Sequence, residues 1–210
     1  MKITEISPQK KQKKRCNIYA DGQFVLGITE HTAVQHGLHT GMEWNAQLQL
    51  TLAEEDAFFC AREAAYSLLA ASAKTEAQII TALERKGFDD HIISKTVTVL
   101  HSQGYLNDRE LAASLIKRNS DYGRLALTQK LRQKGVSRED AEEALEELTE
   151  EDEMAAAIAL AQKNLYRYAS LPEREKRAKL SQFLARRGFS WDIIRSAINA
   201  CIEDSFENDD

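Results

Sequence analysis

The chain has 210 residues, of which 43% are hydrophobic and 29% are charged, and its formal net charge at pH 7 is −5. Two prolines and nine glycines, with abundant Ala, Leu, Glu, Lys and Arg, favour a mainly helical protein. The net negative charge argues against a surface that binds nucleic acid everywhere, so any such binding must come from local basic patches.

The first 50 residues differ in pattern from the rest of the chain. A basic run leads into β-favouring sequence: Lys10, Lys11, Lys13, Lys14 and Arg15. The Asp21-Gly22 pair that follows, between two apolar runs, is a strong signal for a β-hairpin. We expect a third strand over residues 3–6, a short helix over residues 30–36 that ends at Gly37, and a returning strand over residues 44–52.

Helical spacing of apolar residues begins at about residue 54. We expect a helix over residues 89–103 that stops at Gly104, and a long helix that opens at residue 150 and continues to residue 168. Capping boxes, in which two side chains satisfy the free amides of a helix start, are predicted at three places: Thr75 with Gln78, Asn107 with Glu110, and Ser170 with Glu173.

One pattern occurs three times, centred on Gly87, Gly135 and Gly188, which are 48 and 53 positions apart. Aliphatic residues stand eight and four positions before each glycine, on one helix face. Glycine ends a helix readily in the left-handed conformation, and the cation directly before it suits the negative end of the helix dipole. A capping candidate then starts a second helix in each copy: Asp89, Ser137 and Ser190. The pattern predicts a helix–turn–helix pair, repeated three times.

A lead helix before each pair completes three-helix units, which stack on their neighbours into an elongated, curved array. We therefore predict a mainly α protein of tandem three-helix repeats, preceded by a small β-containing module. The expected parts are an N-terminal module with a β-hairpin (residues 1–52), three repeats (53–104, 105–149 and 150–204) and an acidic tail (205–210).

Cations recur at equivalent helix ends in the three repeats: Arg85 and Lys86, then Lys130, Arg132 and Lys134, then Arg186 and Arg187. Three more precede the middle pair: Lys117, Arg118 and Arg124. Dipole complementation and solubility suffice to explain any one of them. Their recurrence favours a shared surface for phosphates or for acidic groups of a protein. We predict that these residues bind a partner or nucleic acid, with the basic run of residues 10–15 as a secondary candidate.

No catalytic set is evident. His31, His36 and His39 lack the spacing of a zinc-binding helix, and the glycines form no phosphate loop. The three cysteines form neither a CxxC pair nor a disulfide framework. We expect no metal, no cofactor and no enzymatic activity. With neither a signal sequence nor a long apolar run, we expect a cytoplasmic protein that does not bind a membrane. We also expect a monomer.

Three motifs resemble the RecX family of bacterial regulators of the RecA recombinase. They are Lys-Gly-Phe/Val before an amphipathic helix, Thr75-Glu-Ala-Gln78, and Gly104-Tyr-Leu-Asn-Asp-Arg109 before a lead helix. The resemblance covers about residues 65–202, and the N-terminal module is similar to the extension of longer members. Two positions depart from the family pattern: Asn107 stands where Asp is frequent, and Gly123-Arg-Leu125 stands where Gly-Pro is frequent.

The resemblance implies a curved helical body that binds within the groove of the filament of RecA on single-stranded DNA. It also implies a non-catalytic modulator that restrains ATP turnover, filament growth and strand exchange in recombination, DNA repair and the SOS response. The alternative is a free-standing DNA-binding helical protein that acts without a recombinase. Acids at the starts of the second helices, such as Asp89-Asp90 and Glu139-Asp140, argue against that alternative because they would repel DNA.

Overall fold

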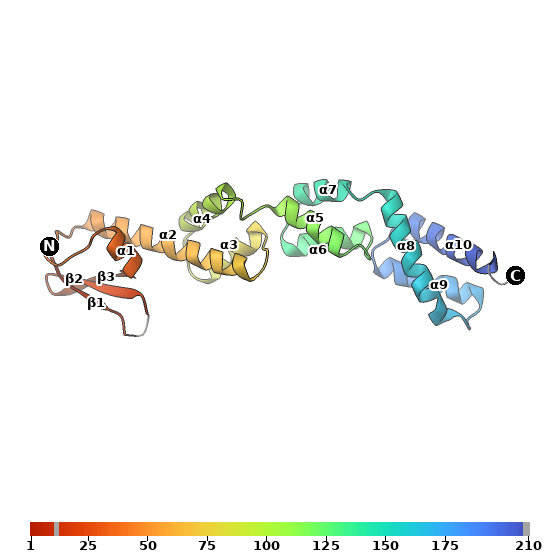
Figure 1. Cartoon of the computed structure of the whole chain (residues 1–210), viewed down its shortest axis with the longest axis horizontal. Helices are drawn as coiled ribbons and strands as arrows, with labels where there is room; N and C mark the ends of the chain where they lie inside the picture. The colour runs from red at the N-terminus through yellow and green to blue at the C-terminus, as the bar shows by residue number, and fades with distance from the viewer. Residues whose placement is uncertain (11–12, 208–210) are drawn as a thin grey trace. The chain divides into compact units, whose positions relative to one another are not determined.

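The structure is a computed structural model that describes residues 1–10 and 13–207, with side chains described up to residue 202. The described chain is mainly helical, with a small sheet near its N-terminus (Figure 1). It divides into two compact units, Met1–Ala73 with Ile79–Leu106, and Lys74–Gln78 with Asn107–Asp210. The prediction of a mainly α protein of three-helix repeats with a small β-containing module is confirmed.

The sheet has three antiparallel strands in the order β1-β2-β3: β1 (Ile3–Pro8), β2 (Arg15–Ala20) and β3 (Gln23–Thr29). Asp21 and Gly22 both have positive φ, 48° and 79°. Two such residues form the tight turn whose twist matches that of the flanking strands. The predicted hairpin and the predicted third strand are both confirmed.

The strand expected over residues 44–52 is wrong, because this segment begins a helix. After the short helix α1 (Glu30–Gln35), α2 runs over Ala46–Ala71. The Asn45 side chain caps it by accepting the amide of Leu48 at 2.8 Å. Leu48, Leu50 and Leu52 alternate as in a strand, but in the helix Leu52 is fully buried while Leu50 remains 66% exposed. Alternation over so few residues does not separate a strand from a helix.

Two further helices complete the first unit: α3 (Glu76–Arg85), whose residues 76–78 belong to the second unit, and α4 (Asp90–Ser102). Their buried aliphatic residues pack against α2, as Ile79 and Leu83 of α3 do beside Ala61 and Ala65. A separate core lies between the sheet and the start of α2, where Ile18 and Leu52 are fully buried.

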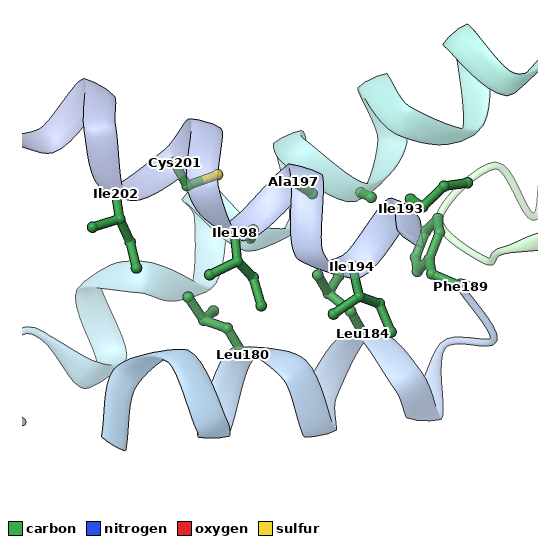
Figure 2. Packing of buried hydrophobic residues seen from close by; sticks show 11 residues of the cluster. Leu180, Leu184, Phe189, Ile193, Ile194, Ala197, Ile198, Cys201 and Ile202 are labelled. Carbon is green, nitrogen blue, oxygen red and sulfur yellow. The ribbon is translucent and has the colours of Figure 1, made fainter. Parts of the chain in front are cut away.

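The second unit holds the other helices of the described chain: α5 (Asp108–Arg118), α6 (Arg124–Lys134), α7 (Arg138–Glu146), α8 (Glu150–Leu165), the 3₁₀ turn η1 (Tyr166–Tyr168), α9 (Glu173–Arg186) and α10 (Trp191–Glu207). Figure 2 shows Leu180 and Leu184 of α9 facing Ile194 and Ile198 of α10. α10 continues through residues 205–207 of the predicted acidic tail, and residues 208–210 lie outside the described residues.

One of the three predicted capping boxes is complete: Thr75 and Gln78 exchange hydrogen bonds of 3.3 Å in both directions. The second is half formed, because the Asn107 side chain accepts the amide of Glu110 at 3.0 Å while the Glu110 carboxylate accepts from the Asn107 side chain, at 3.3 Å, and not from its amide. The box at Ser170 is wrong, because α9 begins only after Pro172. A residue that precedes proline is disfavoured in the helical conformation, so Leu171 cannot serve as the first helical residue.

All three repeated glycines end a helix as predicted. Gly87, Gly135 and Gly188 have φ of 85°, 81° and 84°, the left-handed region that favours glycine. The helices they end, α3, α6 and α9, are called the middle helices below. The following helix is capped by the side chain of Ser137 in the second repeat and of Ser190 in the third. Asp89 stands at the equivalent position before α4 without a side-chain cap bond.

Candidate partner-binding surface

Most of the predicted cations at the middle-helix ends are exposed. The last turn of a helix leaves carbonyl groups without helical partners, and a cation beside them is favourable. The glycine then turns the chain away, which keeps these side chains outside the cores. Exposed members of the set are Arg85, Lys86, Arg132, Lys134 and Arg186.

Lys117 and Arg118 lie in the last turn of α5, as the sequence predicted for the segment before the middle pair, and both are exposed. The Arg118 Nε atom donates to the carbonyl oxygen of Ser114 at 3.4 Å. They therefore add two charges to the second repeat without entering its core.

Lys130 and Arg187 come from different repeats and meet at one aromatic ring. The Lys130 Nζ atom lies 4.0 Å from the centroid of Tyr122, and the Arg187 guanidinium carbon lies 4.7 Å from it. Arg187 also pairs with the Asp121 carboxylate. Cation–π contacts and this ion pair fix both cations, so they are less mobile than the exposed members of the set.

Arg124 serves the interior of the second unit. Its guanidinium donates to the carbonyl oxygen of Leu145, in the last turn of α7, at 2.8 Å, and to that of Leu148, just after the helix. It also lies 3.8 Å from the buried Glu153 carboxylate, which accepts the Arg124 amide at 2.8 Å. Arg124 is therefore a structural residue, because these bonds connect α6 with α7 and with the start of α8.

The N-terminal cations also divide into exposed residues and one residue that is bonded inside its unit. Lys10, Lys13 and Lys14 are exposed, and Lys11 lies outside the described residues. Arg15, by contrast, donates to the carbonyl oxygen of Gly27 at 2.8 Å and pairs with the buried Asp56 at 3.2 Å. Its charge is therefore used between the sheet and α2.

A groove of about 800 Å³ runs between α6 and α7 beside two of the predicted cations, Arg124 and Arg132. Its floor includes Val136, Ala141 and Leu145, and Arg138 and Glu142 stand at its edge. The Arg138–Glu142 pair at 2.6 Å is exposed on both sides, so it contributes little to stability. Within the described part of the chain, no cluster of His, Cys, Asp or Glu is suited to hold a metal ion, and no helix is long and apolar enough to span a membrane.

Several residues of this region carry no local sequence signal for their role, above all Tyr122 and Glu153. Both act through contacts that are distant in sequence, which local patterns do not report. Arg124 did leave a signal, because Arg177 stands at the same distance before its own glycine. Arg177 clamps the third repeat in a similar way, by donating from α9 to Asn199 of α10 at 2.7 Å.

Glycine-linked three-helix units with basic helix ends, behind a small β module, define a helical-repeat protein. Four models of one family match this architecture in order: Regulatory protein RecX N-terminal domain (residues 1–45), and the first (61–100), second (107–145) and third (150–198) three-helix domains of RecX. The chain belongs to the RecX family of regulatory proteins.

Individual relatives agree with this placement. Regulatory protein RecX of Clostridium botulinum strain Eklund 17B is 30% identical over 204 residues, which cover 96% of each chain. Regulatory protein RecX of Leuconostoc mesenteroides is 32% identical over 212 residues, covering 100% of this chain and 78% of the relative. A crystal structure of regulatory protein RecX matches with a TM-score of 0.71 at 29% identity, covering 94% of this chain and 98% of the other.

Proposed function

We propose that this protein binds the filament that the RecA recombinase forms on single-stranded DNA and restrains its ATP hydrolysis, its growth and its strand exchange. The observation that carries the proposal is the recurrence of exposed cations at equivalent helix ends in a chain of the RecX family. The action takes place in the cytoplasm, modulates recombination, DNA repair and the SOS response, and requires binding alone without a catalysed reaction.

Repeated charge suits a repeated target. A filament presents phosphates and acidic side chains at regular intervals, and each repeat of this chain offers cations in the same local frame. The chain carries a net charge of −5, so its attraction to a polyanion must come from local groups of cations such as these helix ends. The proposed contact set consists of the exposed members, with Lys130 and Arg187 in support: Arg85, Lys86, Lys117, Arg118, Arg132, Lys134 and Arg186.

The test is a titration of the protein against ATP hydrolysis by RecA on single-stranded DNA, with filament binding measured alongside. Reversing two exposed charges in the variant Arg132→Glu/Lys134→Glu should weaken filament binding and reduce its dependence on salt. Arg174→Glu/Lys179→Glu is the matched control, because these residues are also exposed cations but lie on α9 away from its glycine end.

Two results would contradict the proposal. Equal losses in both variants would mean that only overall charge matters. Tight binding of the wild-type protein to naked DNA, without an effect on ATP hydrolysis, would favour the free-standing DNA-binding protein instead.

A further inference from the structure

The two glycine turns of the second unit receive hydrogen bonds from the start of a preceding middle helix. The Thr75 hydroxyl, before α3, donates to the carbonyl oxygen of Lys134 at 2.7 Å. The Gly123 amide, before α6, donates to the carbonyl oxygen of Arg187 at 2.9 Å. Lys134 and Arg187 both directly precede a repeated glycine, so the same carbonyl of the repeat is used twice. Such carbonyls at a helix end lack helical partners and need donors from elsewhere.

Close approach accompanies both hydrogen bonds. A Cβ on Gly135 would lie 2.7 Å from the Cβ of Ala77, and a Cβ on Gly188 would overlap Ala126. Ala77 and Ala126 both stand in the first turn of a middle helix. A glycine in the turn and a small residue in the helix are thus the steric requirements of this docking.

The residues on either side of the glycine also take part in the docking, one by burial and one by its charge. The residue after the glycine is buried in both docked turns, with exposed fractions of 6% for Val136 and 3% for Phe189. In the second case the cation before the glycine, Arg187, pairs with Asp121, which lies just before the docked helix. Both docked turns therefore take a helix start that carries a small residue, and in the third repeat an acid just before that helix also pairs with the cation of the turn.

The third copy of this turn, residues 85–88 of the first unit, is open. Apart from Gly87 itself and its two chain neighbours, no described residue has an atom within 4 Å of the position that a Cβ on Gly87 would take. Arg85 and Lys86 are exposed, and Phe88 is only partly buried, unlike its two counterparts. The chain thus presents a docking turn with the sequence of the occupied ones and without their occupant.

We propose that residues 85–88 dock the first turn of a helix of a partner protein, with a small residue in that turn and an acidic residue just before it. Charge complementarity favours such an acid, since it would face Lys86 as Asp121 faces Arg187. A second copy of this chain fits poorly, because its remaining middle helix, α9, begins after Pro172, which has no N–H to donate. α9 also has 14 residues, against 10 in α3 and 11 in α6, and its extra first turn is charged. The inference rests on the proposed function in taking the partner to be a RecA subunit of the filament.

The experiment compares Gly87→Asn with Gly37→Asn in filament binding. Both glycines have positive φ, 85° and 59°, with nothing within 4 Å of an added Cβ, and asparagine tolerates this conformation better than most residues. Both variants should unfold at the same urea concentration as each other. Gly87→Asn should bind the filament at least tenfold more weakly than the wild-type protein, and Gly37→Asn should bind as the wild-type protein does. A photoreactive benzophenone residue in place of Lys86 should cross-link to the start of a RecA helix.

The outcomes separate the two ideas. Wild-type affinity in Gly87→Asn would overturn the docking turn and leave the proposed function standing. Equal losses in the two variants, or a cross-link to DNA or to a second copy, would also overturn it. Absence of filament binding by the wild-type protein would overturn the proposed function and this inference together.

Discussion

The Thr75 hydroxyl donates a hydrogen bond of 2.7 Å to the carbonyl oxygen of Lys134, although the two residues are 59 positions apart. Thr75 is fully buried, and its hydroxyl oxygen also accepts a hydrogen bond from the amide of Gln78 at 3.3 Å. One side chain therefore caps the start of α3 and satisfies a carbonyl at the end of α6. Local capping and a contact between repeats depend on the same atom.

Replacing this hydroxyl should destabilise the protein. Thr75→Val keeps the shape of the side chain but leaves the Lys134 carbonyl and the Gln78 amide without this partner, which costs about 2 kcal/mol in the free energy of unfolding. Thr75→Ser retains the oxygen and should cost less than about 1 kcal/mol. Urea unfolding checks both. Equal stability of the two variants would show that the methyl group, and not the hydrogen bond, matters here.

Gly123 should not tolerate a side chain, although its φ of −75° is allowed for any residue. A Cβ there would collide with the backbone of Gly188 and Phe189. We expect Gly123→Ala to lower the free energy of unfolding by about 1–3 kcal/mol through overpacking. Leu125→Ala is the control, because Leu125 is 65% exposed and its truncation should change stability by less than about 0.5 kcal/mol. A neutral Gly123→Ala would mean that the two backbones can separate at little cost.

Local rules recovered most of the elements from the sequence. Glycine ends, hairpin turn residues and the spacing of apolar residues act over a few positions, so Gly135 and Asp21-Gly22 were interpreted correctly. The errors arose where two local signals compete. The spacing of Leu48, Leu50 and Leu52 fits both the two-residue period of a strand and the period of a helix. At Ser170 the sequence resembles a helix cap, but Pro172 disfavours the helical conformation for the residue before it.

The candidate surface was less predictable, because its differences are set by long-range contacts. Arg124 and Arg132 are both cations of the same helix, yet Arg124 donates to the carbonyl oxygen of Leu145 in α7 while Arg132 is exposed. Whether a cation is available depends on where distant carboxylates and rings lie, as Tyr122 shows for Lys130 and Arg187. Which of the exposed cations contact a partner stays a prediction.

Asp56 should be essential to the N-terminal module. Asp56 is only 5% exposed. Its carboxylate accepts hydrogen bonds from the Thr29 amide at 2.7 Å, the Thr32 hydroxyl at 2.9 Å and the Arg15 guanidinium at 3.2 Å. Asp56→Asn leaves a half-buried guanidinium without its counter-charge, so we expect a loss of about 3 kcal/mol in unfolding experiments. Glu55→Gln, next to it on α2 but partly exposed, should cost less than about 1 kcal/mol. Similar losses in both would contradict a special role for Asp56.

Two thiols should make the protein less stable at alkaline pH. Burial raises the pKa of the Cys60 thiol, and the charge of Asp56 acts in the same direction. Burial also raises the pKa of Cys16. Because the pKa is higher in the folded state, this stabilisation is complete below the unfolded pKa of about 8.5 and is lost as the pH rises through the folded value. Urea unfolding should show a decline above about pH 8, and Cys60→Ala should make it shallower. An unchanged slope in Cys60→Ala would contradict this account.

Arg124 and Arg132 should separate stability from partner binding. Arg124→Gln removes the donors to Leu145 and Leu148 and leaves the buried Glu153 without its nearby cation, so we expect a loss of about 2–3 kcal/mol in the free energy of unfolding. Arg132→Gln removes the same charge from an exposed site and should leave stability within about 0.5 kcal/mol of the wild-type protein. Under folded conditions, however, only Arg132→Gln should weaken binding to the recombinase filament, because only its side chain is free to reach a partner. Urea unfolding curves and filament binding, measured on the same preparations of the two variants, test the expected effects on stability and on binding. If the folded Arg124→Gln protein bound more weakly than Arg132→Gln, the division between internal and surface cations would be wrong.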